Sequence, residues 1–73
     1  MQIDAAGKTT VVINGKPTLT SARTLAELVA CGGFIESHVA TALNGAFVPR
    51  SARDDTSLRE GDSVEIVAPR QGG

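Results

Sequence analysis

The residues best placed to do chemistry stand at the end of the sequence, in the stretch APRQGG that closes on Gly72 and Gly73. Glycines at a terminus are common and often carry no function, since they contribute no side chain to packing. A carboxylate on such a thread has no Cβ beside it, and glycine permits backbone angles that other residues avoid. It could therefore enter a narrow channel in a partner. A carboxylate is a poor electrophile until a leaving group is attached, so the tail by itself does not establish a reaction.

The rest of the sequence offers little other chemistry. It contains one cysteine, Cys31, and one histidine, His38. A disulfide within the monomer and a cysteine-based zinc site are therefore excluded. We find no Ser-His-Asp set, no carboxylate pair with an obvious pocket and no glycine-rich phosphate loop. We expect Cys31 to be a small buried residue at a helix end and His38 to have a structural place at a strand start. An enzyme is the least favoured class.

Size and charge narrow the class of protein further. The chain has 73 residues, which fits one small domain. Seven Lys and Arg are balanced by eight Asp and Glu, for a net charge of -1, and these charges are dispersed. This balance argues against a nucleic-acid partner. No apolar stretch approaches the roughly 20 residues of a membrane span, and the first residues lack a signal-peptide pattern. We therefore expect no membrane partner and a cytoplasmic location.

Two Asn-Gly pairs predict two β-hairpins. Asn14-Gly15 lies between the β-branched runs 9–13 and 18–20, and Asn44-Gly45 lies between 39–43 and 46–48. Asn-Gly is the strongest short-range hairpin signal because both residues tolerate a positive φ. We assign both pairs to turn geometry alone. Pro17 suits an edge strand because it cannot donate to a ladder, and Pro49 ends the second hairpin.

The segment SARTLAELVACGG predicts a helix of about eight to ten residues. Thr24 or Ser21 can cap it, and Glu27 stands at the capping-box spacing from Thr24. Leucine and valine at 25, 28 and 29 share one helical face. Gly32-Gly33 is typical of a left-handed end to a helix.

The remaining chain predicts a turn or 3₁₀ piece over Asp54 to Leu58, a turn at Gly61-Asp62, and a half-buried strand over 64–68 that Pro69 ends. The order hairpin, helix, hairpin, strand favours an α+β fold of the β-grasp (ubiquitin-like) kind. We expect a mixed sheet of four to five strands, with the last strand beside the first and one main helix on one face. We divide the chain into a lead-in (1–10), the β-grasp domain (11–68) and a C-terminal tail (69–73).

Five motifs in this order resemble the ThiS family, the sulfur carrier proteins of thiamine biosynthesis. They are VVINGKP, TLAEL, ALNGAFVPRS, LREGDSVEIV and the terminal QGG. The resemblance covers roughly residues 11–73. The sequence departs from the family pattern at its N-terminus. About ten residues precede the first motif, whereas family members usually start almost directly on the first strand. Close relatives with the same fold and Gly-Gly end include the MoaD-like small subunit of molybdopterin synthase.

The resemblance implies a protein co-substrate instead of an enzyme. A ThiF-like adenylyltransferase of the ubiquitin-activating type would use ATP to convert the carboxylate of Gly73 into an acyl-adenylate. A sulfur donor, such as a cysteine desulfurase or a rhodanese-like protein, would then yield a thiocarboxylate. A ThiG-like thiazole synthase would take the sulfur. No bound cofactor is expected, because ATP belongs to the partner.

Partner binding is expected at the tail and on the sheet face that the helix leaves uncovered. An exposed apolar patch on a small domain commonly marks an interface. Arg70 could contact an acidic groove of a partner or remain solvated. One of Phe47 and Val48 could belong to the patch, although Phe47 could instead pack in the core. Arg50 could brace a turn or touch a partner. The predicted partner-binding residues are Gly72, Gln71, Arg70, Val67, Val12 and Phe47.

Two alternatives remain open. The first is a carrier that supplies sulfur to another pathway, such as molybdopterin synthesis. The second is a β-grasp interaction module that only docks, whose function would survive removal of Gly72 and Gly73.

Overall fold

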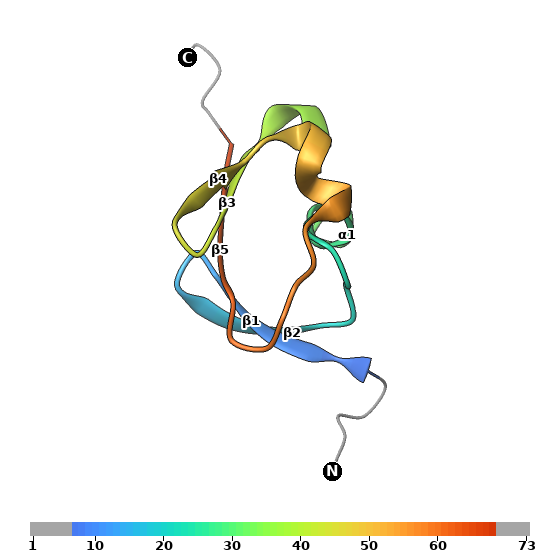
Figure 1. Cartoon of the computed structure of the whole chain (residues 1–73), viewed down its shortest axis with the longest axis vertical. Helices are drawn as coiled ribbons and strands as arrows, with labels where there is room; N and C mark the ends of the chain where they lie inside the picture. Colours follow the sequence, from blue (N-terminus) through green and yellow to red (C-terminus); the bar gives the residue numbers. More distant parts are fainter. Residues whose placement is uncertain (1–6, 69–73) are drawn as a thin grey trace.

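The computed structural model describes residues 7–68. They form one mixed five-stranded sheet with a single α-helix packed on it, and the strand order is β2-β1-β5-β3-β4 (Figure 1). The first and last strands, β1 and β5, lie side by side and parallel at the centre. This confirms the predicted β-grasp fold. The elements are β1 (Thr9–Ile13), β2 (Lys16–Thr20), α1 (Leu25–Cys31), η2 (Glu36–His38), β3 (Ala40–Leu43), β4 (Ala46–Val48), η3 (Arg50–Asp55) and β5 (Ser63–Val67).

Both predicted hairpins are present. Asn14 and Gly15 have φ angles of 50° and 87°, and Asn44 and Gly45 have φ angles of 51° and 87°. A positive φ at both turn residues is the geometry of a type I′ turn, which matches the twist of the flanking strands. Pro17 lies in β2, an edge strand, as expected.

The two turn asparagines do more than bend the chain, so their assignment to turn geometry alone was wrong. The side chain of Asn14 bridges to β5: its Nδ2 donates to the Ile66 carbonyl at 3.0 Å, and its Oδ1 accepts from the Ile66 N–H at 2.9 Å. Asn44 reaches β5 from the other side, where its Oδ1 accepts from the Ser63 N–H at 2.9 Å. Each hairpin is thereby fastened to the central strand by its own turn.

The helix begins as predicted, at the Thr24 cap. Thr24 Oγ1 accepts from the Glu27 N–H at 3.2 Å, while Glu27 Oε1 accepts from the Arg23 N–H at 2.6 Å. The helix has seven residues, fewer than expected, and Gly33 follows it with a φ of 80°. Cys31 is exposed, so its expected burial was wrong. It is the last residue of a helix whose buried strip consists of Leu25, Leu28 and Val29.

The 3₁₀ segment lies earlier than predicted, at η3 instead of Asp54 to Leu58. Pro49 has φ −68° and ψ 156°, and its carbonyl accepts from the Ala52 N–H at 2.9 Å, so the turn starts directly after β4. The Thr56 N–H donates to the Arg53 carbonyl at 3.2 Å and ends it. His38 was predicted at a strand start, but it is the last residue of η2 and lies two residues before Ala40, where β3 begins.

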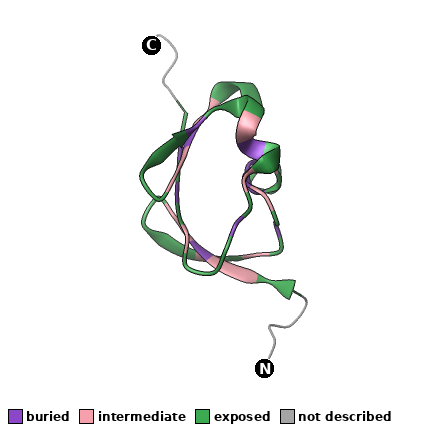
Figure 2. Cartoon of the chain, in the orientation of Figure 1, coloured by how far each residue is buried: buried purple, intermediate pink, exposed green. Residues whose placement is uncertain are grey.

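The core lies between α1 and one face of the sheet (Figure 2). β5 alternates exposed and buried residues along its length, and its two buried side chains are Val64 and Ile66. Among residues 7–68, no helix has the length and hydropathy needed to cross a membrane. The buried core side chains are Val11, Ala22, Leu25, Leu28, Val29, Val48, Leu58, Val64 and Ile66.

The clamping role of the turn asparagines can be tested by a matched pair of variants. Asn14→Gly keeps the positive φ but removes two partly buried hydrogen bonds to Ile66. We expect it to lower the free energy of unfolding by about 1–2 kcal/mol. Asn44→Gly should cost less, since its bonds to Ser63 and Asp62 are exposed to water. Urea denaturation of both variants measures the difference. Small and equal losses, of the size that the added glycine entropy alone explains (about 0.5–1 kcal/mol), would contradict the clamps.

Candidate docking site

The candidate site lies on the sheet face opposite the helix, at the end of β5. Because side chains alternate along a strand, Glu65 and Val67 point away from the core that holds Val64 and Ile66. The register places Ala40 of β3 opposite Val67 and Ala42 opposite Glu65. Phe47 of β4 lies opposite Ala42. Together these residues line a shallow hollow of about 200 Å³, here called the apolar hollow, formed by Ala40, Ala42, Phe47, Glu65 and Val67 with Thr41.

Large apolar side chains in this hollow are open to solvent. Phe47 is 70% exposed and Val67 is 56% exposed, while Val48 is buried. The structure therefore decides between the two candidates of β4: Val48 packs in the core and Phe47 does not. The small side chains of Ala40 and Ala42 leave room between Phe47 and Val67. Such a patch is the kind of surface that proteins bury against a partner.

Val12 is not brought into the hollow. It is half-buried and pairs with Ser63, the first residue of β5, whereas Val67 is the last. It does not line the hollow. Of the three predicted sheet-face residues, the structure thus gathers Val67 and Phe47 and leaves Val12 near the opposite end of β5.

The predicted tail residues Arg70, Gln71, Gly72 and Gly73 lie outside the described residues, as does Pro69. The last described residue is Ala68, which follows Val67 at the end of β5. The chain therefore leaves the described domain at the edge of the apolar hollow. Val67, the last residue of β5, pairs there with Ala40, the first residue of β3.

An exposed ion pair joins the two 3₁₀ segments near this end. Arg50 and Glu36 form an exposed ion pair with an N···O distance of 3.7 Å, which braces η3 against η2. Exposed pairs of this kind contribute little stability. Glu65 is the charged residue of the hollow itself. Between residues 7 and 68, no three His, Cys, Asp or Glu side chains are grouped so that they could hold a metal ion.

Sequence reasoning missed one buried residue at this end, Arg53. It is 3% exposed. Its guanidinium donates to Thr41 Oγ1 at 3.0 Å, to the Glu36 carbonyl at 2.9 Å and to the Val39 carbonyl at 2.7 Å. No signal in the polar stretch RSARDD distinguishes it from the solvent-exposed Arg50. Only the tertiary structure brings the three acceptors around it.

Comparisons with known proteins agree with this architecture. The family model described as "ThiS family" matches residues 5–73. The crystal structure of a thiamine biosynthesis protein (ThiS) from Geobacter metallireducens is 32% identical, covers 89% of this chain and all of its own, and superimposes with a TM-score of 0.72. An NMR structure of a thiamine biosynthesis protein from Geobacter metallireducens is 32% identical to this chain and superimposes with a TM-score of 0.74. The match covers 89% of this chain and 88% of that protein's chain. A search of curated proteins found no match. With a family match over nearly its whole length and this fold, the chain belongs to the ThiS family.

Proposed function

We propose that this protein carries sulfur for thiazole formation in thiamine biosynthesis, and that the carboxylate of Gly73 is its reactive group. The observation that carries the proposal is the ThiS family match, which continues through the glycines to residue 73. The position of the apolar hollow beside the end of β5 supports it. The chain is then a co-substrate that enzymes of the cytoplasm act on, and it supplies a carboxylate instead of a catalytic site.

The first step would activate the carboxylate. A Gly73 carboxylate oxygen attacks the α-phosphorus of ATP in a partner adenylyltransferase, and pyrophosphate leaves. The resulting acyl-adenylate has AMP as its leaving group, which a free carboxylate lacks. ATP binding belongs to the ThiF-like partner in this scheme.

The second step would install sulfur. The terminal sulfur of a persulfide, held by a cysteine desulfurase or a rhodanese-like protein, attacks the carbonyl carbon of Gly73 and expels AMP. A thiol then reduces the S–S bond of the acyl disulfide, which leaves the thiocarboxylate on the carrier and a disulfide on the thiol partners. A ThiG-like thiazole synthase accepts the sulfur from this thiocarboxylate.

The tail sequence fits such a route. Glycines at 72 and 73 add no Cβ to a chain that must enter an enclosed site. Five residues, 69–73, span roughly 16 Å when extended at about 3.3 Å per residue. Pro69 fixes one φ angle and cannot donate to a continued strand, which favours a tail separate from β5. Arg70 and Gln71 would make polar contacts along the channel.

Docking on the apolar hollow would hold the domain while the tail enters the active site. Phe47 and Val67 supply apolar area, and Ala40 and Ala42 provide the depression between them. Glu65 on the same surface favours a partner with a basic side chain among apolar ones. Val12 would lie at the margin of such an interface.

The first experiment is an intact mass of the protein recovered from cells, or after incubation with the adenylyltransferase, ATP and a persulfide donor. We expect replacement of one oxygen by one sulfur, mapped to the C-terminal peptide. An unchanged mass, under conditions that convert an established carrier, would contradict the proposal and favour the interaction module that only docks.

A bulky residue at the last position should block activation. We expect Gly73→Val to abolish carrier-dependent release of pyrophosphate from ATP, because its side chain widens the end of the tail. Ala5→Val adds side-chain bulk at the other end of the sequence and should leave turnover unchanged. Thermal denaturation should be the same for both variants. Normal turnover of Gly73→Val would exclude a narrow channel for the tail.

The hollow can be tested with two charges placed at sites of similar exposure. Val67→Asp puts a carboxylate in the hollow, whereas Leu19→Asp puts one on β2, where Leu19 is 63% exposed. We expect Val67→Asp to weaken adenylyltransferase binding by about tenfold or more and Leu19→Asp to have little effect, as measured by isothermal titration calorimetry. If Val67→Asp keeps full affinity and an unchanged melting curve, Val67 lies outside the interface.

A further inference from the structure

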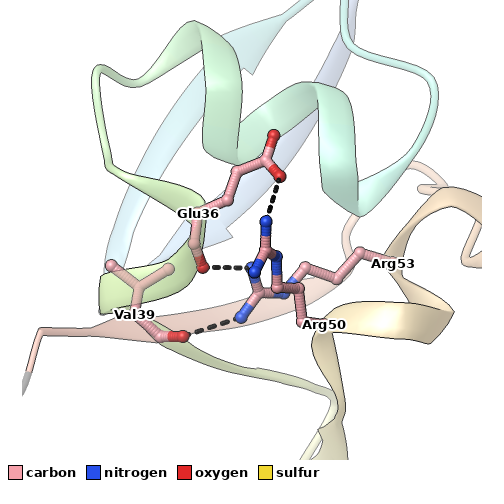
Figure 3. Close-up of polar contacts among 4 residues, drawn as sticks. All are labelled: Glu36, Val39, Arg50 and Arg53. Carbon is pink, nitrogen blue, oxygen red and sulfur yellow. Dashed lines mark hydrogen bonds and ion pairs between the residues drawn. The ribbon is translucent and has the colours of Figure 1, made fainter.

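Arg53 is a buried cation that makes directional hydrogen bonds to three acceptors in the stretch that runs from η2 into β3. From η3, its side chain donates to the carbonyl of Glu36 in η2 and to the carbonyl of Val39 (Figure 3). It also donates to the hydroxyl of Thr41 in β3. Within residues 7–68, the ion pair at this place belongs to Arg50 and Glu36, and no carboxylate pairs with Arg53. A buried charge is costly unless its donors are satisfied. Here the acceptors are two backbone carbonyls and one hydroxyl. Arg53 therefore acts by fixing the positions of these groups, and not by pairing with an opposite charge.

These contacts converge on the strand that forms the hollow. Val39 immediately precedes β3, and the first residue of β3, Ala40, pairs with Val67. Thr41 accepts from Arg53 Nε and itself donates to the Val48 carbonyl at 2.8 Å. The guanidinium therefore fixes the start of β3 from the inner side of the sheet, while Ala40 and Val67 present their side chains on the outer side.

We propose that Arg53 is a positioning residue for partner recognition: it holds Ala40, and through it the Val67 end of β5, in the geometry that the adenylyltransferase binds. This inference rests on the proposed function. An apolar side chain of similar volume could fill the same space without the desolvation of a charge. What an apolar residue cannot do is fix Glu36, Val39 and Thr41 relative to one another through a rigid planar group.

The test compares three variants of the full-length chain. Arg53→Met keeps much of the stem and removes the guanidinium. Arg53→Lys keeps the charge but has one nitrogen, which cannot reach three separated acceptors. Val11→Ala is the control, because Val11 is buried in β1 and pairs with Thr18 on the side away from β3. Pyrophosphate release by the adenylyltransferase is measured against carrier concentration, at a temperature where all variants are folded.

We expect Arg53→Met to raise the KM for the carrier by about tenfold, since a small displacement of a binding surface has effects of this order or larger. Arg53→Lys should not restore the wild-type KM. Val11→Ala should lower the melting temperature and leave KM unchanged. Amide hydrogen exchange gives a readout without the partner: Arg53→Met should speed exchange around Ala40 and Val67 more than in the β1–β2 hairpin.

Three results would overturn the inference. They are a wild-type KM for Arg53→Met, full restoration by Arg53→Lys, and an equal rise in KM for Val11→Ala at a similar loss of stability. Failure of the proposed function looks different, because the wild-type chain would then support no pyrophosphate release at all, and both proposals would fall. Normal wild-type turnover with an unchanged KM for Arg53→Met removes the inference alone.

Discussion

The arrangement of this small domain depends on β5, which is hydrogen-bonded along both of its edges. It runs parallel to β1 on one side and antiparallel to β3 on the other, so the two hairpins join into one sheet only through it. The turn asparagines strengthen this dependence, because Asn14 bonds to the backbone of Ile66 and Asn44 to that of Ser63. Because β5 is held from both sides, the side chain of its last residue, Val67, has a defined direction, and its neighbour across the ladder is Ala40.

The side chains of β5 also divide between the two faces of the sheet. Val64 and Ile66 complete the core beneath α1, and Glu65 and Val67 face outward in the apolar hollow. Since the alternation has a period of two, a slip of one residue in register would exchange the two sets. Stability and the proposed partner recognition therefore constrain the same five residues of β5, and the asparagine side chains that fix the register of β5 would serve both.

Local signals in the sequence were enough to predict most of the fold. Asn-Gly specifies a type I′ turn, and Thr24 with Glu27 specifies where a helix begins, because in each case the interaction lies within a few residues. The outward position of Val67 followed from simple alternation. Phe47 remained ambiguous between core and surface until the pairing of β3 with β4 showed that Val48, and not Phe47, faces inward.

What could not be predicted depended on long-range contacts. The burial of Arg53 requires η2, β3 and η3 to meet, and no property of the stretch RSARDD contains that information. The bonds from Asn14 to Ile66 join residues that are 52 positions apart. Cys31 was misplaced because the helix ends at that residue, just beyond its buried strip. The tail was singled out by its composition and by resemblance, and its role stays a prediction.

The two edges of the sheet have a consequence for a protein that exposes apolar side chains. Ile13 and Lys16 are the pair that closes the tight turn between β1 and β2. Because hydrogen-bonded and non-hydrogen-bonded pairs alternate in an antiparallel ladder, the backbone groups of the next pair, Val12 and Pro17, point away from each other. The nitrogen of Pro17 therefore faces the free edge of β2, where it has no hydrogen to donate. At the other edge, β4 is only three residues long and is ended by Pro49. Short or proline-blocked edges resist the strand-to-strand addition that leads to aggregation. Phe47 and Val67 are therefore exposed on a sheet whose edges offer neighbouring copies little template for a continuous sheet.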